Sequence, residues 1–290
     1  MVPRQAEQWQ LTAPLPALRR PDGVLQLGLE PPAGLIVGRL PPRAEKVIDA
    51  LLKPCEPDRI ELIAGPASRQ WLPQLLGALE RAGLLRRSIP PSEPVTVVGT
   101  GRLALLVTRL LLASIAEPVR VVWPGVPDTP TVLTRLLKQH SNRLSVSGHT
   151  GGEETGLVLV CARALEPDRA VLRQVGGRAQ LVVCGTDLGA SVGPLVVPGR
   201  TPCLRCEDLH RARRDPAWPE LLLQLSRPRP VDAPVPDLHW AAGLAVLHAA
   251  CWLAGGLPDS LGATLALDAE RALRMRRLRP HPGCGCGAVS

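Results

Sequence analysis

Four cysteines in two close pairs are the residues of this chain best suited to chemistry. The first pair is Cys203 and Cys206, and the second is Cys284 and Cys286. Four thiolates suit a structural zinc ion, which prefers a closed tetrahedron of sulfur ligands. Glycines flank the second pair and let the backbone curl, so that two sulfurs two positions apart can point at one ion. The sequence therefore predicts one shared metal site; the alternatives are a redox pair at the first position or inert thiols at both.

The other four cysteines stand alone in apolar surroundings and are expected in the core: Cys55, Cys161, Cys184 and Cys251. Unpaired thiols together with a thiolate–metal site fit a reducing compartment, so we expect a cytoplasmic protein. No N-terminal apolar run resembles a signal peptide, and no uncharged stretch reaches the roughly 18 residues that span a bilayer. We therefore expect no membrane partner.

A glycine-rich turn is the second candidate site. Gly99, Gly101 and Ala104 follow a predicted buried strand, Val95–Val98, and open a helical stretch that runs to Leu112. This spacing is typical of a nucleotide-binding loop: the first glycine turns the chain, and the second lets backbone N–H groups approach a phosphate. The small third residue packs helix on strand. The same turn can also be no more than the way this kind of fold begins.

The residues that would complete a nucleotide site are missing. An acidic residue should end the second strand and hold the ribose hydroxyls, but this chain has Trp123 there, and Asp128 lies five residues further on. After the third predicted strand, where a carboxylate for magnesium could lie, stands Cys161-Ala162-Arg163-Ala164. No nucleophile–base arrangement is legible elsewhere. We therefore expect a degenerate loop, no tight ATP binding and no catalytic residues.

The length and composition suit two domains. The chain has 290 residues, of which 45% are apolar, so it can bury a substantial core, although it contains no Phe and no Tyr. The stretch Ser88–Pro94 holds three prolines and lacks any periodic pattern, which predicts a linker. The predicted domains are residues 1–90 and 91–290.

The first domain resembles a winged helix in its predicted order of elements. Gly23–Leu29 and Gly34–Leu40 are short apolar runs separated by prolines, which indicates a hairpin. Three helical stretches follow, Ala44–Leu52, a patch around Ile60–Ile63, and Ser68–Ala82. Two strands followed by three helices form the outline of a winged helix.

The second domain alternates apolar runs with helical segments, which predicts a parallel sheet covered on both faces. A strongly apolar helix is expected to be packed or to form a dimer contact. The predicted strands after the glycine loop are 119–123, 157–161, 181–184, 265–267 and 271–279, and the apolar helix spans 238–253.

Together these residues resemble the ThiF-like, ubiquitin-activating-enzyme-like proteins, and within them the cyclodehydratase-type, leader-peptide-binding proteins of actinobacteria. The resemblance covers nearly the whole chain. It rests on the 90-residue start, the glycine loop and the segment Val192–Cys206, which reads VGPLVVPGRTPCLRC. It implies an α/β fold: a Rossmann-like ThiF-type domain with a zinc-binding site of four cysteines, preceded by a winged-helix-like domain.

The resemblance also implies roles for both domains. In that family the two cysteine pairs bind zinc, which would carry over to Cys203, Cys206, Cys284 and Cys286. The N-terminal domain there is a peptide clamp in which a leader peptide adds a strand to the wing, which implies strands 23–29 and 34–40 here. We expect the groove between strand and helix, lined by residues such as Leu72, Leu75 and Leu79, to supply selectivity. The branch has commonly lost ATP binding and leaves ATP chemistry to a YcaO-type partner, and this sequence follows that pattern.

The function expected from the sequence is a non-catalytic, zinc-stabilised scaffold, a homodimer, that presents a peptide or protein to a modifying enzyme. The first alternative is an adenylating enzyme that uses Gly99–Ala104. The second is a winged-helix regulator that binds nucleic acid. The net charge is +8, but the first 90 residues carry 12 Lys and Arg against 9 Asp and Glu, only +3. Because nucleic-acid-binding domains are strongly basic, a nucleic-acid partner is not expected.

Overall fold

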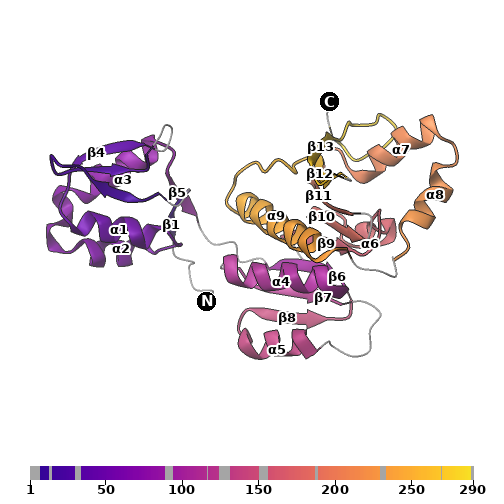
Figure 1. Ribbon diagram of the computed structural model, residues 1–290, viewed down its shortest axis with the longest axis horizontal. Coiled ribbons are helices and arrows are strands. Elements are labelled where there is room, and N and C mark those ends of the chain that lie inside the picture. The colour runs from indigo at the N-terminus through magenta and orange to yellow at the C-terminus, as the bar shows by residue number, and fades with distance from the viewer. Residues whose placement is uncertain are drawn as a thin grey trace. The chain divides into compact units, whose positions relative to one another are not determined.

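The chain divides into two units, Met1–Pro90 and Pro91–Ser290, which are taken in turn (Figure 1). The predicted linker Ser88–Pro94 lies largely outside the residues that the structure describes; only its first and last residues are inside. The structure, a computed structural model, describes residues 7–12, 15–29, 34–88, 94–115, 117–123, 131–149, 156–186, 189–228, 233–268 and 270–288.

The first unit contains an antiparallel meander of three strands, β2 (Ala17–Arg19), β3 (Val24–Leu27) and β4 (Leu35–Arg39), in the order β2-β3-β4. The two strands of the predicted hairpin are therefore present and paired. Alternate residues of β3, Leu25 and Leu27, are fully buried, so one face of the meander covers the core. A separate two-stranded ladder joins β1 (Gln8–Leu11) to β5 (Leu85–Ser88).

Three α-helices and a short 3-10 turn pack on the meander. They are α1 (Arg43–Leu51), α2 (Pro57–Ala64), η1 (Pro66–Gln70) and α3 (Leu72–Arg81). The single helix predicted over Ser68–Ala82 is in fact η1 followed by α3, separated at Trp71 (φ −133°). Pro73 explains the break, because a proline has no N–H for a preceding helical turn and is tolerated only at a helix start. The order of strands and helices matches the winged-helix outline, which itself stays a prediction.

The second unit is built on an eight-stranded sheet in the order β13-β12-β11-β10-β9-β6-β7-β8. Strands β6 to β10 are parallel and β11 to β13 are antiparallel, so the predicted parallel sheet is confirmed for the first five. The strands are β6 (Val95–Gly99), β7 (Val119–Val122), β8 (Leu144–Ser147), β9 (Leu157–Ala162), β10 (Ala179–Thr186), β11 (Gly189–Val196), β12 (Ala263–Leu267) and β13 (Leu273–Arg277).

β6 and β9 are neighbours in the sheet. From β6 the strands follow in chain order toward one edge, β7 then β8, and from β9 they follow toward the other edge, β10 to β13. The strand order therefore reverses between β6 and β9. In parallel α/β sheets, ligands bind beyond the carboxyl ends of the strands at this reversal. Gly99 at the end of β6 lies opposite Cys161 of β9, so the glycine loop begins at this reversal.

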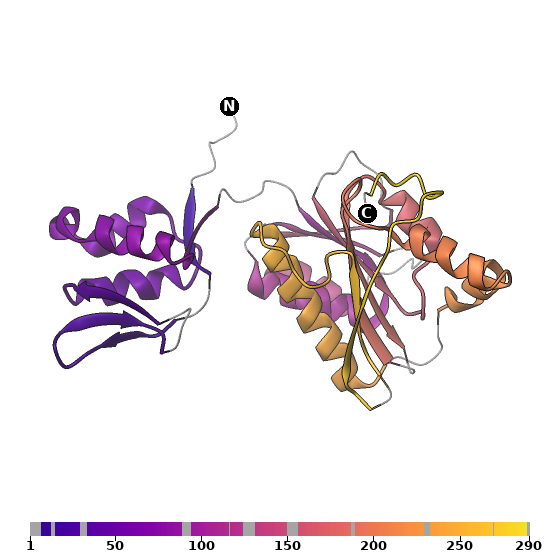
Figure 2. The ribbon, with the colours of Figure 1, turned by 90° about the horizontal axis from the view of Figure 1, so that it is seen from above.

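Helices cover both faces of this sheet (Figure 2). On one face α4 (Gly101–Ser114) and α9 (Val235–Leu253) enclose the main core, and α5 (Thr131–Gln139) lies beside α4. On the other face lie α6 (Arg169–Gln174) and α7 (Leu204–Arg214), and α8 (Trp218–Leu225) packs on α7. The predicted apolar helix 238–253 is α9, which begins three residues earlier. None of the helices within the described ranges is both long and apolar enough to cross a bilayer.

Three of the four isolated cysteines are core residues as predicted, since Cys55, Cys161 and Cys184 are 5–6% exposed. Cys251 on α9 is only partly buried.

Candidate functional site

The four paired cysteines come together in the second unit. Their sulfur atoms all lie within 4.8 Å of one another. The Sγ atoms of Cys203 and Cys284 are 3.5 Å apart, as are those of Cys206 and Cys286. Four Zn–S bonds of about 2.3 Å in a tetrahedron place the sulfurs about 3.8 Å apart, so the cluster has the dimensions of a thiolate–zinc site. Because each sulfur has a close neighbour from the other pair, the arrangement disfavours an isolated redox pair.

Two turns with left-handed glycines bring the pairs together. After β11, the N–H of Val197 donates to Oγ1 of Thr201 at 2.8 Å and closes the first turn. The N–H of Gly199 (φ +73°) then donates to the carbonyl of Cys286 at 3.2 Å. A Cβ on Gly287 (φ +77°) would lie 3.4 Å from Cα of Gly199, so the two turns are in direct contact. The glycines that the sequence places around Cys284 and Cys286 thus serve a close backbone approach.

The first cysteine pair lies at the start of α7, and a side chain of α7 contacts the segment before the second pair. Cys203 is the N-cap residue of α7, and Cys206 lies in its first turn with its N–H on the carbonyl of Cys203. The N–H of Cys284 donates to the carbonyl of His281 at 2.9 Å. His210 on α7 contacts the Pro280 carbonyl through Nε2 at 3.1 Å, which ties the helix to the segment before the second pair.

The protonation of these thiols fits a metal centre. Burial raises the pKa of Cys203 and of Cys284. Burial acts in the same direction on Cys286, but hydrogen bonds from the Ala288 N–H and the Cys206 thiol lower its pKa to about 7. The pKa of Cys286 is therefore lower than those of Cys203 and Cys284, which hold their protons more tightly. A divalent cation would displace those protons, since thiolates and not thiols bind metals.

Ion pairs hold α7 in place behind the cysteines. Arg169 makes a two-pronged contact with Asp208, both N···O distances being 2.8 Å, and also meets Glu166 at 2.9 Å. Arg211 extends this network with ion pairs to Glu166 at 2.8 Å and to Glu207 at 2.9 Å. The side chains of Arg169, Asp208 and Glu166 are each 16% exposed, so solvent screens these contacts only partly.

The glycine loop lies between a strand and a helix, as the sequence predicts, and the sheet order places it at the reversal. A Cβ on Gly99 (φ +144°) would lie 2.2 Å from the carbonyl oxygen of Cys161. One on Gly101 (φ +85°) would lie 2.6 Å from Cδ of Arg163. Ala104 is fully buried between α4 and the sheet. Packing within the unit therefore accounts for all three small residues, with or without a nucleotide.

The end of the second parallel strand carries no carboxylate within the described residues. Trp123 follows β7 directly, is 7% exposed and joins the main core. Its indole N–H has no hydrogen-bond partner among the described residues. Asp128, the other candidate for this position, lies outside them. Arg163, next to the glycine loop, is a further cation at the reversal point that the sequence did not single out as a site residue.

A second candidate site lies in the first unit, at the edge of the meander. Among the described strands β4 pairs only with β3, so its other edge has no partner strand. A cavity of about 590 Å³ opens next to it, between the end of β4, the start of α1, η1 and α3. Gln74 of α3 reaches the edge and donates from Nε2 to the carbonyl of Val37 at 3.5 Å. The cavity is lined by Arg39, Leu40, Pro41, Arg43, Ala64, Pro66, Ala67, Gln70, Trp71 and Gln74.

One sequence-based expectation about this edge is wrong. Leu72, Leu75 and Leu79 were expected to line a groove between strand and helix, but they are 6%, 0% and 0% exposed and belong to the core. The leucine stripe is the face by which α3 packs on the unit. The residues beside the edge are Gln70, Trp71 and Gln74, which lie next to that leucine stripe. Only this position beside the stripe could have identified them from the sequence.

No protein-family model matches the sequence, and no curated protein matches it in sequence. The fold, however, is that of solved structures. E. coli MccB aligns with 98% of this chain and 97% of its own, at 15% identity and a TM-score of 0.54. A structure of MccB with MccA gives 14% identity and a TM-score of 0.55 over 97% and 99% of the two chains. A heterocyclase in complex with substrate and cofactor gives 18% identity and a TM-score of 0.51 over 98% of this chain, which spans 40% of the heterocyclase.

These likenesses define the class of fold. Since MccB and the heterocyclase match over almost the whole chain, the chain shares their fold, in agreement with the resemblance stated from the sequence. At identities of 13–18% the similarity is one of architecture. The actinobacterial origin stays a prediction.

Proposed function

We propose that this chain is a non-catalytic, zinc-stabilised ThiF-like scaffold that binds a peptide or protein and presents it to a partner modifying enzyme. The pathway would be thiazole/oxazole-type peptide biosynthesis or a related one, and the partner a YcaO-like enzyme. The observation that carries the proposal is the edge of β4 that pairs with no described strand, beside the cavity at α3. The structures of MccB with MccA and of a heterocyclase with its substrate support it by analogy of fold.

The edge of β4 has the properties that an added peptide strand requires. An edge strand presents N–H and C=O groups to which an extended peptide can bond, and side-chain pockets beside it supply selectivity. The amide of Gln74 on the Val37 carbonyl occupies a place that a peptide N–H could take. Ile36 on β4 is 57% exposed and offers an apolar contact. We infer that the peptide lies along β4 and faces α3.

Charge at the same cavity indicates what the peptide should contain. Arg39 and Arg43 both line the cavity, both are exposed, and neither forms an ion pair within the described part of the chain. Their guanidinium groups favour a carboxylate in the bound segment. We therefore propose that the recognised peptide carries an Asp or Glu next to an apolar residue.

The test titrates candidate precursor peptides encoded near the gene into the full-length protein and follows backbone amide shifts. The expected result is a set of shifts confined to β4, α3 and the start of α1, where Arg43 lies. Replacing Arg39 and Arg43 with Glu should weaken binding about tenfold or more, since two charge-assisted contacts become repulsive. Arg59→Glu, an exposed arginine of α2 outside the cavity, is the matched control and should bind as the unaltered protein does. Binding that leaves the amides of β4 unmoved would place the recognition surface elsewhere.

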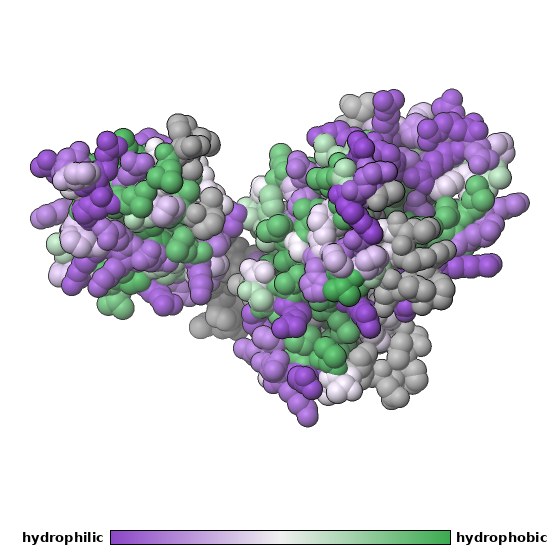
Figure 3. Space-filling view, viewed as in Figure 1, coloured by the Kyte–Doolittle hydropathy of each residue, from purple (hydrophilic) through white to green (hydrophobic). Residues whose placement is uncertain are grey.

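A homodimer is part of the proposal, and α9 supports it. This helix has 19 residues and only one formally charged side chain, Asp237. Figure 3 shows hydrophobic side chains gathered over this part of the second unit. Leu247 on α9 and Leu257 just after it are 67% and 72% exposed. A helix that is apolar all round is normally buried, so we propose that a second copy covers its outer face.

An adenylating enzyme is the second candidate, because one solved structure of E. coli MccB contains ATP. In this chain the glycine loop lies at the reversal of strand order, and Arg163 beside it could meet a phosphate. Against this candidate stands Trp123, which fills the position where a ribose-holding carboxylate is expected. ATP–pyrophosphate exchange in the presence of the peptide separates the two candidates: exchange supports the enzyme, and its absence supports the scaffold.

A further inference from the structure

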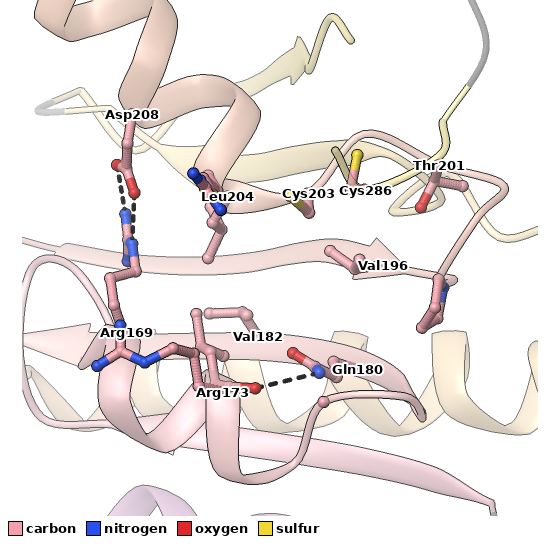
Figure 4. Close-up of a pocket in the computed structure, with 14 residues that line it drawn as sticks. Arg169, Arg173, Gln180, Val182, Val196, Thr201, Cys203, Leu204, Asp208 and Cys286 are labelled. Carbon is pink, nitrogen blue, oxygen red and sulfur yellow. Dashed lines mark hydrogen bonds and ion pairs between the residues drawn. The ribbon is translucent and has the colours of Figure 1, made fainter. Parts of the chain in front are cut away.

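A second cavity lies in the other unit, on the face of its sheet opposite α9 (Figure 4). Its volume is about 620 Å³, within the range of about 300–1,000 Å³ that ligand sites usually have. Strands β10 and β11 form the floor, and α6 and α7 form the walls. The ion pair of Arg169 with Asp208 closes one end, and Cys203 and Cys286 lie at the other. Neither the metal centre nor the β4 edge accounts for this space.

The floor of the cavity is apolar. Val182 of β10 and Val196 of β11 are buried in the sheet, and Leu204 of α7 and Leu172 of α6 face them. Such a surface takes up an apolar side chain with a gain of about 25 cal/mol for each Å² removed from water. The cavity therefore favours a ligand with an aliphatic group.

One polar side-chain atom in this floor lacks a donor. Gln180 is 9% exposed, and its amide nitrogen donates to the carbonyls of Leu172 at 3.3 Å and Val175 at 3.1 Å. Both acceptors are carbonyl oxygens, so the orientation of the carboxamide is fixed by chemistry and its oxygen faces away from them. No donor from the described residues reaches that oxygen, and Figure 4 shows it turned into the cavity. A ligand N–H would satisfy it.

The rim of the cavity is positive. Arg173 of α6 and Arg205 of α7 line it from opposite walls, and neither forms an ion pair with a carboxylate in the described ranges. Arg169, deeper in the wall, differs from both because Asp208 and Glu166 already neutralise it. Two guanidinium groups at the mouth of an apolar cavity favour a carboxylate.

We propose that this cavity binds an N-acylated aliphatic α-amino acid, the chemistry of a peptide C-terminus that ends in Leu, Ile or Val. The carboxylate lies between Arg173 and Arg205, and the amide N–H donates to the oxygen of Gln180. The side chain rests on Val182 and its neighbours. The site is in a different unit from the β4 edge, and its test is independent of the function proposed above.

The test uses the full-length, zinc-loaded protein and three small probes at millimolar concentration, followed by the backbone amide signals of Gln180 and Val182. N-acetyl-leucine should bind. N-acetyl-leucinamide lacks the charge and 4-methylpentanoate lacks the amide N–H, so each should bind about tenfold more weakly or worse. Equal binding of the amide would overturn the role of the arginines. Equal binding of 4-methylpentanoate would overturn the peptide C-terminus in favour of a simple aliphatic acid.

Variants make the test specific to the site. Arg173→Gln and Arg205→Gln should each weaken N-acetyl-leucine about tenfold, and both are exposed side chains whose loss leaves the core intact. Arg214→Gln, an exposed arginine on the same helix as Arg205 but outside the cavity, is the control and should change nothing. Absence of binding by all three probes, or unchanged binding in the Arg173/Arg205 double variant, would overturn the proposal.

Discussion

Replacing Cys206 with serine tests the metal centre most directly. The residue is fully buried, and its sulfur lies 3.5 Å from that of Cys286. With serine in its place three thiolates are left, and a zinc ion then has an incomplete shell of sulfur ligands. We expect Cys206→Ser to lose most of its metal and, with it, the link between α7 and the segment after β13.

The size of the effect follows from the length of chain that the metal closes. Cys206 and Cys286 are 80 residues apart in the sequence. A covalent cross-link around a loop of that length is worth about 4–5 kcal/mol in the chain-entropy relation, and we take this as the scale for the metal link. Domains are typically stable by about 5–15 kcal/mol, so the loss is a large fraction. At about 2–4 °C per kcal/mol, the melting midpoint of the second unit should fall by roughly 10–20 °C.

Calorimetry of the full-length protein gives two internal comparisons. The first unit contains none of the four cysteines, so its transition should stay where it is. Cys251→Ser, a change of the same chemistry at a partly buried site on α9, should shift the second transition far less. Elemental analysis should find about one zinc per chain in the unaltered protein. The reasoning would be refuted if freshly purified protein contained no zinc, or if Cys206→Ser and Cys251→Ser had the same melting midpoint.

Three further changes probe other parts of the molecule. Arg169→Gln leaves the carboxylate of Asp208, 16% exposed, without its cation, and should lower the free energy of unfolding in urea by about 2–4 kcal/mol; an unchanged midpoint would show that the pair contributes nothing. Gly101→Ala places a Cβ 2.6 Å from Arg163 at φ +85°, so it should destabilise the second unit by about 1–3 kcal/mol in the absence of any nucleotide. Calorimetry of the unaltered protein should find no low-micromolar affinity for ATP·Mg, and such an affinity would contradict the degenerate loop. Leu247→Glu should convert a dimer to a monomer in light scattering, and a dimer that persists would exclude the outer face of α9.

The sequence predicted the strands that contain uninterrupted apolar runs and missed two whose runs are broken. β9 is such a run and β10 contains one, Leu181–Cys184, because helices cover both sides of them. β8 reads Leu-Ser-Val-Ser at the edge of the sheet, and β11 contains two glycines and a proline. Neither sequence can be told from that of a loop. Each segment is extended because it pairs with a neighbouring strand, which the local sequence does not show. α7 was missed for a similar reason, since it is rich in charge and has few apolar positions.

The same division between local and distant information holds for the sites. The spacing within each cysteine pair is local, so the pairs could be recognised, and their convergence was a correct prediction of a distant contact. The partners of Arg169 carry no such signal, because Glu166 and Asp208 approach it only after α6 and α7 are in place. The lining of the β4 edge was predicted wrongly because helical periodicity identifies the face that is buried. It does not identify which polar flank lies next to an open strand.

The distance along the chain between the two cysteine pairs also sets the timing of folding in the cell. The first pair ends at Cys206 and the second begins at Cys284, 78 residues later. At about 5–20 residues per second, a ribosome needs roughly 4–16 s to make that interval. During this time the second unit has two of the four clustered thiols, and β12 and β13 are still being made. The first unit, whose last strand is β5, is complete long before. A growing chain therefore carries a finished N-terminal unit while its C-terminal unit still awaits its last two strands and the second pair of its cysteine cluster.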